Sequence, residues 1–211
     1  MAPIALIYNG GWAPYVMSHA SKYRALIDLV YVHDIVPGSL DGYEAVMVPF
    51  NAHQKAMKAL RDEVFTVLGR GGKVFVEGNS TWLDATWEDR PVNNYWWVTD
   101  PTNPPAAVTD YDHPVYAGLQ PRHACWHTHG IYTAIPDHAR VVQSNKAGEA
   151  VTWETSAYGG TLLVTTMDPI VEHGVQQIRH LDNYVDNLIS WLCGVRPQGQ
   201  FDIDWQVGLA A

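Results

Sequence analysis

The sequence predicts an α/β protein, a flavodoxin-like three-layer sandwich with a mostly parallel central sheet and a strand-rich second half. Three patterns lead to this prediction. The first half contains short continuous apolar runs, which are typical of parallel strands buried on both faces. Apolar residues at helical spacing between several of these runs indicate the crossover helices that parallel strands need. The second half holds four more strand-like segments in close succession.

The first half divides into four predicted strands and two predicted helices. In chain order these are a strand over Ile4–Tyr8, a helix within residues 15–29, a strand over Val30–Val36, a strand over Ala45–Pro49, a helix carrying the apolar stripe Met57–Leu68 and a strand over Val74–Val76. Glycine and proline pairs mark the turns, as at Gly10-Gly11 and Pro37-Gly38. The order β-α-β-β-α-β predicts parallel pairing with right-handed crossovers.

The second half begins with an irregular region. Residues 78–112 lack clear periodicity and are rich in proline and tryptophan, so we expect an ordered excursion over the sheet edge. Predicted strands follow over His123–Thr133, Val141–Ser144, Ala150–Thr155 and Thr161–Thr166, with a hairpin turn at Gly159-Gly160. One long helix is predicted from Val175 to Leu192. We expect one domain over residues 1–195 and a C-terminal tail over residues 196–211 that either docks or is disordered.

Composition narrows the classes of function. The chain has 211 residues, of which 47% are hydrophobic and 17% charged, and this fits an ordered globular domain. The formal net charge of −9 argues against a broad nucleic-acid surface, which needs clustered Lys and Arg. No apolar run approaches the roughly 18 residues of a membrane span. Two cysteines do not make a disulfide framework, so we expect a cytoplasmic protein.

Open α/β sheets bind their ligands at the carboxyl ends of the parallel strands. Polar and aromatic residues follow several predicted strands at this edge. The candidate ligand-binding residues are Asn9, Gly10, Gly11, Trp12, Asn51, His53, Asn79, Ser80 and Trp82. Because these loops meet at one edge, we expect them to bind a small polar molecule.

Glu77, His173 and Asp168 are the candidate catalytic residues. Glu77 ends a predicted strand after three apolar residues, where burial would raise its pKa and suit it to acid–base or nucleophilic work. His173 could act as a base that Asp168 orients. A structural interpretation competes with each role. Glu77 could pair with an arginine or accept backbone amides, His173 could bond to the backbone, and Asp168 could hold the turn before the final helix.

The segment Cys125–His129 contains an H-x-H pair, His127 and His129. Residues two apart on a strand face the same way, so both imidazoles could bind one metal ion with a third ligand from His123 or a distant carboxylate. Two ligands do not make a site, and we predict no metal. We also predict no cofactor, because the chain has neither the phosphate-loop motif nor the dinucleotide-binding glycine motif.

Several segments together resemble the class I glutamine amidotransferase-like superfamily, in particular its ThuA-like and other non-amidotransferase branches. They span about residues 3–195 and comprise Asp41–Pro49, Gly71–Val76, His113–Leu119, Thr165–Pro169 and Ser190–Leu192. The resemblance implies the same α/β fold. It also implies where an amidotransferase would carry its chemistry, with a cysteine at the turn after the fourth strand and a His-Pro-Glu-like pair on a later strand.

This chain departs from the amidotransferase pattern at both places. The turn carries Glu77 and Gly78, and the later segment reads Met167-Asp168-Pro169. Cys125 and Cys193 both lie far from the turn in sequence. Hydrolysis of glutamine through a cysteine thioester is therefore not expected. ThuA-like relatives carry a histidine where Glu77 aligns, so the resemblance assigns no role to Glu77.

Three functions stay open. The first is binding of a small polar ligand, such as a sugar, without cysteine-dependent glutaminase activity. The second is a hydrolase, with glycosidic chemistry as one case, that uses Glu77 with His173 or Asp168. The third is a structural or assembly role in which the aromatic excursion and the tail make protein contacts, including those of a homo-oligomer. We favour the first.

Overall fold

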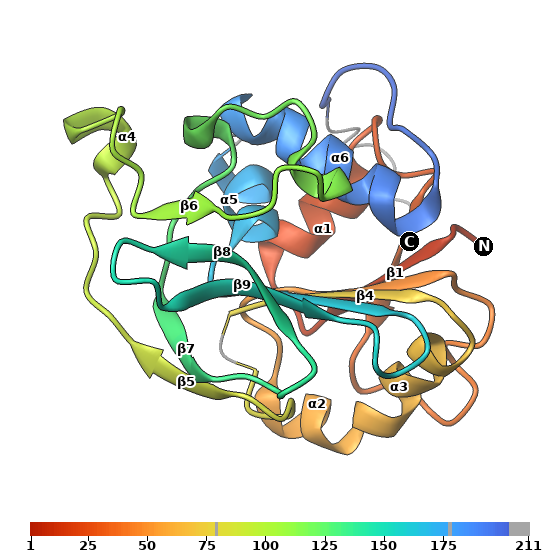
Figure 1. The fold of residues 1–211 in the computed structure, drawn as a ribbon. Helices are drawn as coiled ribbons and strands as arrows, with labels where there is room; N and C mark the ends of the chain where they lie inside the picture. The colour runs from red at the N-terminus through yellow and green to blue at the C-terminus, as the bar shows by residue number, and fades with distance from the viewer. Residues whose placement is uncertain (79, 177–178, 203–211) are drawn as a thin grey trace.

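The structure, a computed structural model, describes residues 1–78, 80–176 and 179–202 (Figure 1). Within these residues the strands are β1 (Ile4–Tyr8), β2 (Ile27–Tyr31), β3 (Ala45–Val48), β4 (Lys73–Glu77), β5 (Thr86–Asp89), β6 (Ala106–Val108), β7 (Gly130–Ala134), β8 (Arg140–Asn145), β9 (Ala150–Thr155) and β10 (Thr161–Thr165). The helices are α1 (Trp12–His19), α2 (Gln54–Ala59), α3 (Arg61–Gly69), α4 (Trp96–Thr99), α5 (Pro169–Gln176) and α6 (Asp182–Cys193), with 3-10 turns at Pro114–Tyr116, Pro121–His123 and Arg179–Leu181.

The strands of the described residues form one sheet in the order β2-β1-β3-β4-β10-β9-β7-β5, and β8 pairs with both β9 and β6. The first five strands in this order are parallel to one another, which is the flavodoxin-like arrangement. The α/β prediction is therefore confirmed. The sheet is mixed, however, so the prediction of a mostly parallel sheet was wrong.

Short connections explain the antiparallel half of the sheet. The residues between β9 and β10 include Gly159 and Gly160, and a turn of that length can join only antiparallel strands. β9 pairs in the same antiparallel sense with β8 and β7, and β7 does so with β5. The predicted hairpin at Gly159-Gly160 is thus confirmed.

Successive side chains of the parallel strands point to opposite faces of the sheet, so each strand contributes to two hydrophobic cores. Leu6, Met47 and Phe75 belong to the core on one face of the sheet, which also contains residues of α1 and α6. Their neighbours Ile7 and Val46 belong to the core on the other face, with residues of α3. Figure 1 shows α1, α5 and α6 on one side of the sheet and α2 and α3 on the other. This is the predicted three-layer sandwich.

The second predicted strand and the helix before it were placed wrongly. The helix was predicted within residues 15–29, but α1 ends at His19, and β2 begins at Ile27 rather than Val30. The amide of Ile4 donates to the carbonyl of Leu26 at 3.1 Å, and β2 then pairs along all of β1. Pairing with β1 thus overrides the local helical spacing that continues past His19.

The long final helix predicted from Val175 to Leu192 is two helices. α5 begins earlier, at Pro169, and α6 begins at Asp182 after a 3-10 turn. Gly194 ends α6 in a left-handed conformation, with φ +72°, as is usual for a glycine after a helix. The earlier start of α5 matters for the site, because it places Asp168 directly before the first turn of that helix.

The excursion over residues 78–112 is ordered at the residues described and contains β5, α4 and β6. α4 projects at the side of the sheet that carries β5 and β6 (Figure 1). Trp96 is buried with Cys125 and Met167 in a small third core, and Trp97 packs against it. No helix among the described residues has both the length and the apolar character to cross a membrane.

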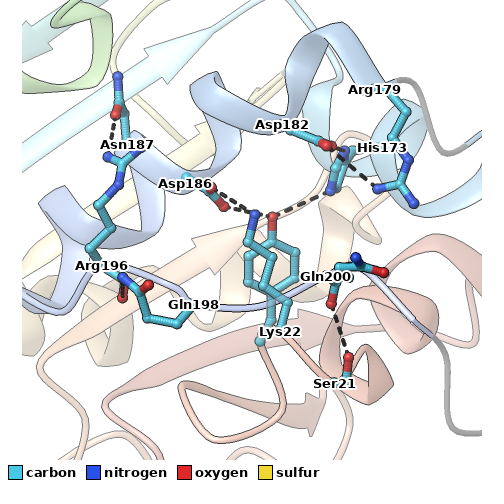
Figure 2. A network of polar contacts seen from close by, with 11 residues as sticks. Ser21, Lys22, His173, Arg179, Asp182, Asp186, Asn187, Arg196, Gln198 and Gln200 are labelled. Atoms are coloured by element: carbon cyan, nitrogen blue, oxygen red, sulfur yellow. Dashed lines mark hydrogen bonds and ion pairs between the residues drawn. The ribbon is translucent and has the colours of Figure 1, made fainter.

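The tail packs against the domain over the part that is described (Figure 2). Phe201 is 4% exposed, and its ring lies 5.8 Å from that of Tyr23 and 4.7 Å from that of His173 between centroids. The amide of Ser21 donates to the carbonyl of Asp202 at 2.7 Å. The tail therefore docks as far as Asp202, and residues 203–211 lie outside the described residues.

Candidate functional site

Glu77 joins three segments at the carboxyl edge of the parallel strands. It ends β4, and its side chain is fully enclosed, with 1% of the residue exposed. Oε2 accepts the backbone amide of Phe50 at 3.1 Å, and Oε1 accepts that of Ile170 at 2.6 Å. Glu77 therefore holds the loop after β3 and the first turn of α5 against the end of β4. This is the amide-accepting role that competed with catalysis in the sequence.

The environment of Glu77 favours its neutral form. Burial raises the pKa of its carboxyl well above the ordinary value, and the amide of Ile170 opposes this. The nearby Asp168 carboxylate raises the pKa further, the amide of Phe50 lowers it, and Glu172 raises it. Glu77 thus lies beside the start of α5, where its carboxyl accepts the amide of Ile170, two residues after Asp168.

Four side chains meet beside this edge, and we call them the carboxylate–histidine cluster: His127, His129, Asp168 and Glu172. An isolated antiparallel bridge between Thr128 and Met167 brings their two segments together, and the amide of His129 donates to the carbonyl of Thr166 at 3.3 Å. Residues on either side of Thr128 share one face, so both imidazoles lie next to the start of α5.

Distances within the carboxylate–histidine cluster are short. His129 Nε2 lies 2.9 Å from Asp168 Oδ2, and His127 Nδ1 lies 4.0 Å from the same oxygen. His127 Nδ1 also lies 3.3 Å from Glu172 Oε1. The amide of Glu172 donates to the carbonyl of Asp168 at 3.0 Å, which is the helical spacing that sets the two carboxylates on one side of α5.

The carboxylate–histidine cluster is largely buried and incompletely paired. Asp168 is 3% exposed and Glu172 is 7% exposed. Asp168 Oδ1, Glu172 Oε2 and His127 Nε2 have no hydrogen-bond partner among the described residues. The His129 side chain is 30% exposed, so the cluster reaches solvent on its side. Buried polar atoms are nearly always paired in folded proteins, so three unpaired ones in one cluster set it apart as the candidate site.

For both Asp168 and His127, burial and the oppositely charged neighbours shift the pKa in opposite directions. Burial raises the pKa of the Asp168 carboxyl above its ordinary value, and the hydrogen bond and charge of His129 oppose this. Burial lowers the pKa of the His127 imidazole, but its hydrogen bond with Glu172 and the charges of Asp168 and Glu172 outweigh that effect, so the pKa is raised. The imidazoles are thus the groups that compensate the buried carboxylates.

Aromatic rings pack around the histidines of the carboxylate–histidine cluster. The His127 ring stacks on Trp126, with centroids 5.0 Å apart and an interplanar angle of 19°, and lies 4.8 Å from the ring of Trp97. The Phe50 ring lies 4.3 Å from that of His129. Phe50 packs over Gly78, which has φ +74° and where a Cβ would overlap the Phe50 ring. The predicted aromatic excursion thus contributes Trp97 to these rings.

Two of the predicted ligand-binding residues that directly follow β1, Asn9 and Gly11, lie against Asn51, which follows β3. Asn9 Nδ2 donates to the carbonyl of Asn51 at 2.7 Å, and Asn9 Oδ1 is buried without a partner among the described residues. Gly11 lies directly against the Asn51 side chain, where a Cβ would overlap it. Trp12 is 51% exposed and stacks on Tyr15 at 5.6 Å. Gly10 takes the turn between β1 and α1 with φ +97°.

The remaining predicted ligand-binding residues are divided between core and surface. Ser80 is buried and its Oγ donates to the carbonyl of Gly78 at 3.2 Å. Trp82 is 3% exposed and belongs to the core beneath α3. His53 is exposed beside His33, with ring centroids 5.7 Å apart. Asn79 lies outside the described residues.

His173 is not part of the carboxylate–histidine cluster. It is completely buried, and its Nε2 lies 3.4 Å from the Tyr23 hydroxyl and its Nδ1 3.6 Å from Asp182 Oδ1 (Figure 2). The Tyr23 hydroxyl also donates to Asp186 Oδ1 at 3.1 Å. His173 follows Glu172 directly in α5, but it belongs to a polar network with Tyr23, in the segment after α1, and with Asp182 and Asp186 of α6.

The strand-end rule also points to the loop that contains Glu172, but neither Glu172 nor Trp97 is among the candidate site residues of the sequence, and His127 and His129 entered it as metal ligands. The H-x-H spacing was the available signal, since it correctly placed both imidazoles on one side of the chain. The position of Glu172, four residues after Asp168, was a second signal once a helix is taken to begin at Pro169.

Neither cysteine supplies a reactive thiolate. Cys125 is fully buried, and burial raises the pKa of its thiol to about 12. Burial also raises the pKa of Cys193, near the end of α6. Nucleophilic cysteines need a lowered pKa and access to substrate, so neither residue fits that role.

Comparison with known proteins finds relatives in structure only. No family model and no curated protein sequence matches the chain. A putative GMP synthase subunit from Thermoplasma acidophilum matches with TM-score 0.56 and 15% identity, over 92% of this chain and 94% of its own. A putative ThuA-like protein from Bacteroides uniformis matches with TM-score 0.51 and 14% identity, over 93% and 96%.

A glutamine amidotransferase from Thermotoga maritima matches with TM-score 0.52 and 10% identity, over 92% of this chain and 94% of its own. At such identities the likeness concerns the fold. All three chains are covered nearly end to end, so the likeness extends over most of the length of each. The chain therefore shares its overall fold with these three solved structures.

Proposed function

We propose that this protein binds a small polar ligand at the carboxyl edge of its parallel strands, against the carboxylate–histidine cluster. The observation that carries the proposal is the set of buried atoms without a partner among the described residues, namely Asp168 Oδ1, Glu172 Oε2 and His127 Nε2. Folded proteins satisfy nearly all such atoms with protein groups, water or a ligand. Two acceptors and a ring nitrogen suit a molecule that carries several hydroxyl groups.

A neutral sugar is the ligand class that the surroundings favour. Trp97 and Phe50 supply aromatic surface next to His127 and His129, and apolar walls with a few fixed polar groups are typical of small-molecule sites. The adjacent carboxylates of Asp168 and Glu172 disfavour an anionic ligand such as a phosphate ester.

We propose that the protein does not hydrolyse glutamine through a cysteine nucleophile. The turn after β4 carries Glu77 and Gly78, and the Cys125 thiol has a pKa raised to about 12. Cys125 and Cys193 are both free, which fits a reducing compartment, and we propose a cytoplasmic location on that ground.

A hydrolase built on Glu77 with His173 or Asp168 has less support. Both oxygens of Glu77 already accept backbone amides, and His173 contacts Tyr23 and Asp182. A general acid or base must reach the proton that it transfers. The geometry favours a positioning role for Glu77 and ligand binding for the cluster.

Calorimetric titration tests the proposal. Purified protein is titrated with neutral mono- and disaccharides, and with glutamine and nucleosides as other polar classes. We expect at least one sugar to bind with one site per chain, and Asp168→Asn to weaken that binding at least about tenfold, the equivalent of 1.4 kcal/mol. The matched control is Asp137→Asn, since Asp137 is exposed between β7 and β8.

Two results would count against the proposal. One is the absence of binding by every compound in the panel at millimolar concentration. The other is equal sugar affinity in the wild type, Asp168→Asn and Asp137→Asn, which would place any binding outside the carboxylate–histidine cluster. Binding of glutamine with release of ammonia would instead support an amidotransferase activity.

A further inference from the structure

We infer that His127, His129 and Asp168 form a binding site for one divalent transition-metal ion of the zinc type. The coordinating atoms are His127 Nδ1, His129 Nε2 and Asp168 Oδ2. The inference rests on the proposed function, because the ion would lie in the same carboxylate–histidine cluster and offer the ligand a coordination position. It goes beyond the sequence analysis, which offered His127 and His129 as ligands, left the third ligand open between His123 and a distant carboxylate, and predicted no metal.

The spacing of the donor atoms fits such an ion. One ligand atom from each of the three residues can be chosen so that all lie within 4.8 Å of one another. Zinc binds imidazole nitrogen and carboxylate oxygen at about 2.0–2.2 Å in tetrahedral sites, so its donors lie roughly 3.4 Å apart. The two separations from Asp168 Oδ2, 2.9 Å to His129 and 4.0 Å to His127, lie on either side of that value.

The chemistry of the donors selects the class of ion. Two imidazoles with one carboxylate suit zinc and the later first-row metals. Calcium and magnesium prefer all-oxygen coordination by more ligands, and this arrangement does not supply it. Three protein ligands leave a tetrahedral ion with one open position, which is the pattern of sites that bind an exchangeable molecule.

Unpaired buried atoms are a second and independent observation. Asp168, 3% exposed, has one oxygen without a hydrogen-bond partner among the described residues, and so does Glu172. The ion pairs of these two carboxylates within the described part of the chain are with His127 and His129, which carry charge only when protonated. A divalent cation would compensate both carboxylates while the imidazoles stay neutral.

Glu172 lies beside the coordinating atoms. Its Oε1 is 3.3 Å from His127 Nδ1, so it can accept a hydrogen bond from a water or ligand hydroxyl at the open position. Rings surround the imidazoles, with Trp126 stacked on His127 and Phe50 against His129. Such outer contacts fix the orientation of ligating histidines.

Cobalt(II) titration of the untagged, chelator-treated full chain tests the inference, with zinc titrated by calorimetry in parallel. A polyhistidine tag must be absent, because it binds the same metals. We expect one ion per chain and the intense visible absorption of four-coordinate cobalt. His127→Gln, His129→Gln and Asp168→Asn should each weaken zinc at least about 100-fold, the upper end of what loss of an outer-sphere partner costs.

Controls separate this site from adventitious binding. His138→Gln and Asp137→Asn change exposed residues between β7 and β8 and should bind zinc like the wild type. Absence of the cobalt absorption in wild-type protein overturns the inference, and so does equal zinc affinity in the cluster variants and the controls. The wild-type spectrum decides the matter even if a cluster variant fails to fold.

The metal inference and the proposed function fail in different ways. Repeating the sugar titration with and without chelator distinguishes them. Sugar binding that is unchanged by chelator, together with no cobalt absorption, keeps the proposed function and overturns the metal site. One zinc ion per chain without binding of any sugar keeps the metal site and counts against the proposed function.

Discussion

Replacing Glu77 by glutamine removes one of the two acceptor oxygens that hold the amides of Phe50 and Ile170. The amide group of glutamine can accept from one of these N–H groups, but its NH₂ would face the other. One buried donor is then left unpaired, which costs about 1–3 kcal/mol. Glu77→Ala leaves both donors unpaired, so its cost should be roughly twice as large.

The pH dependence follows from the raised pKa of Glu77. In the unfolded chain this carboxyl ionises near its ordinary value of about 4.3. In the folded state it stays protonated to higher pH. Wild-type stability therefore has a component that is complete below about pH 4.3 and is lost as the pH rises toward the folded-state pKa. Glu77→Gln lacks this component, so its destabilisation relative to wild type should be larger at pH 5 than at pH 8.

Urea unfolding from pH 5 to pH 8 measures both effects. Glu44→Gln is the matched control, because Glu44 is exposed and its replacement should change stability by less than about 0.5 kcal/mol. The reasoning is refuted if Glu77→Gln and Glu77→Ala are both as stable as the control. It is also refuted if the difference between wild type and Glu77→Gln grows with pH.

Three other perturbations test the fold around the site. Phe201→Ala should lower the free energy of unfolding, measured in urea, by about 3 kcal/mol, because a ring packed on Tyr23 and His173 is lost. An unchanged unfolding midpoint would show that the tail does not dock. Gly78→Ala should cost more than about 1 kcal/mol in the same assay, through its left-handed backbone and the overlap with Phe50, and neutrality would contradict that geometry. Native Cys125 should resist alkylation at pH 7 and react in denaturant, whereas rapid native labelling would contradict its burial.

Local patterns predicted the parallel half of the sheet well. Continuous apolar runs such as Ala45–Val48 are buried on both faces, and this needs no information from distant parts of the chain. The helix predicted within residues 15–29 failed because Tyr23 and Leu26 continue the helical spacing, but Tyr23 is buried in a turn and the carbonyl of Leu26 accepts the amide of Ile4 at the start of β1. Where a helix is followed closely by a strand, the local spacing of apolar residues does not show which of them belong to the helix and which to the strand.

The candidate site was predictable in part. The loops at the strand ends were identified, and Glu77 accepts the amide of Ile170 at the start of α5, two residues after Asp168. The approach of His127 and His129 to Asp168 depends on the bridge between Thr128 and Met167, for which the sequence carries no local signal. His173 adjoins Glu172 in sequence, but successive helical residues point about 100° apart, and His173 lies in the network of Tyr23 and Asp182.

The central claim, that the carboxylate–histidine cluster holds the ligand, is tested most directly by NMR of protein labelled at the histidine ring carbons. Adding the sugar that binds in calorimetry should shift the resonances of His127 and His129 and leave those of the exposed His138 and the buried His173 in place. Shifts confined to His33 and His53, or no histidine shift at saturating sugar, would contradict the claim.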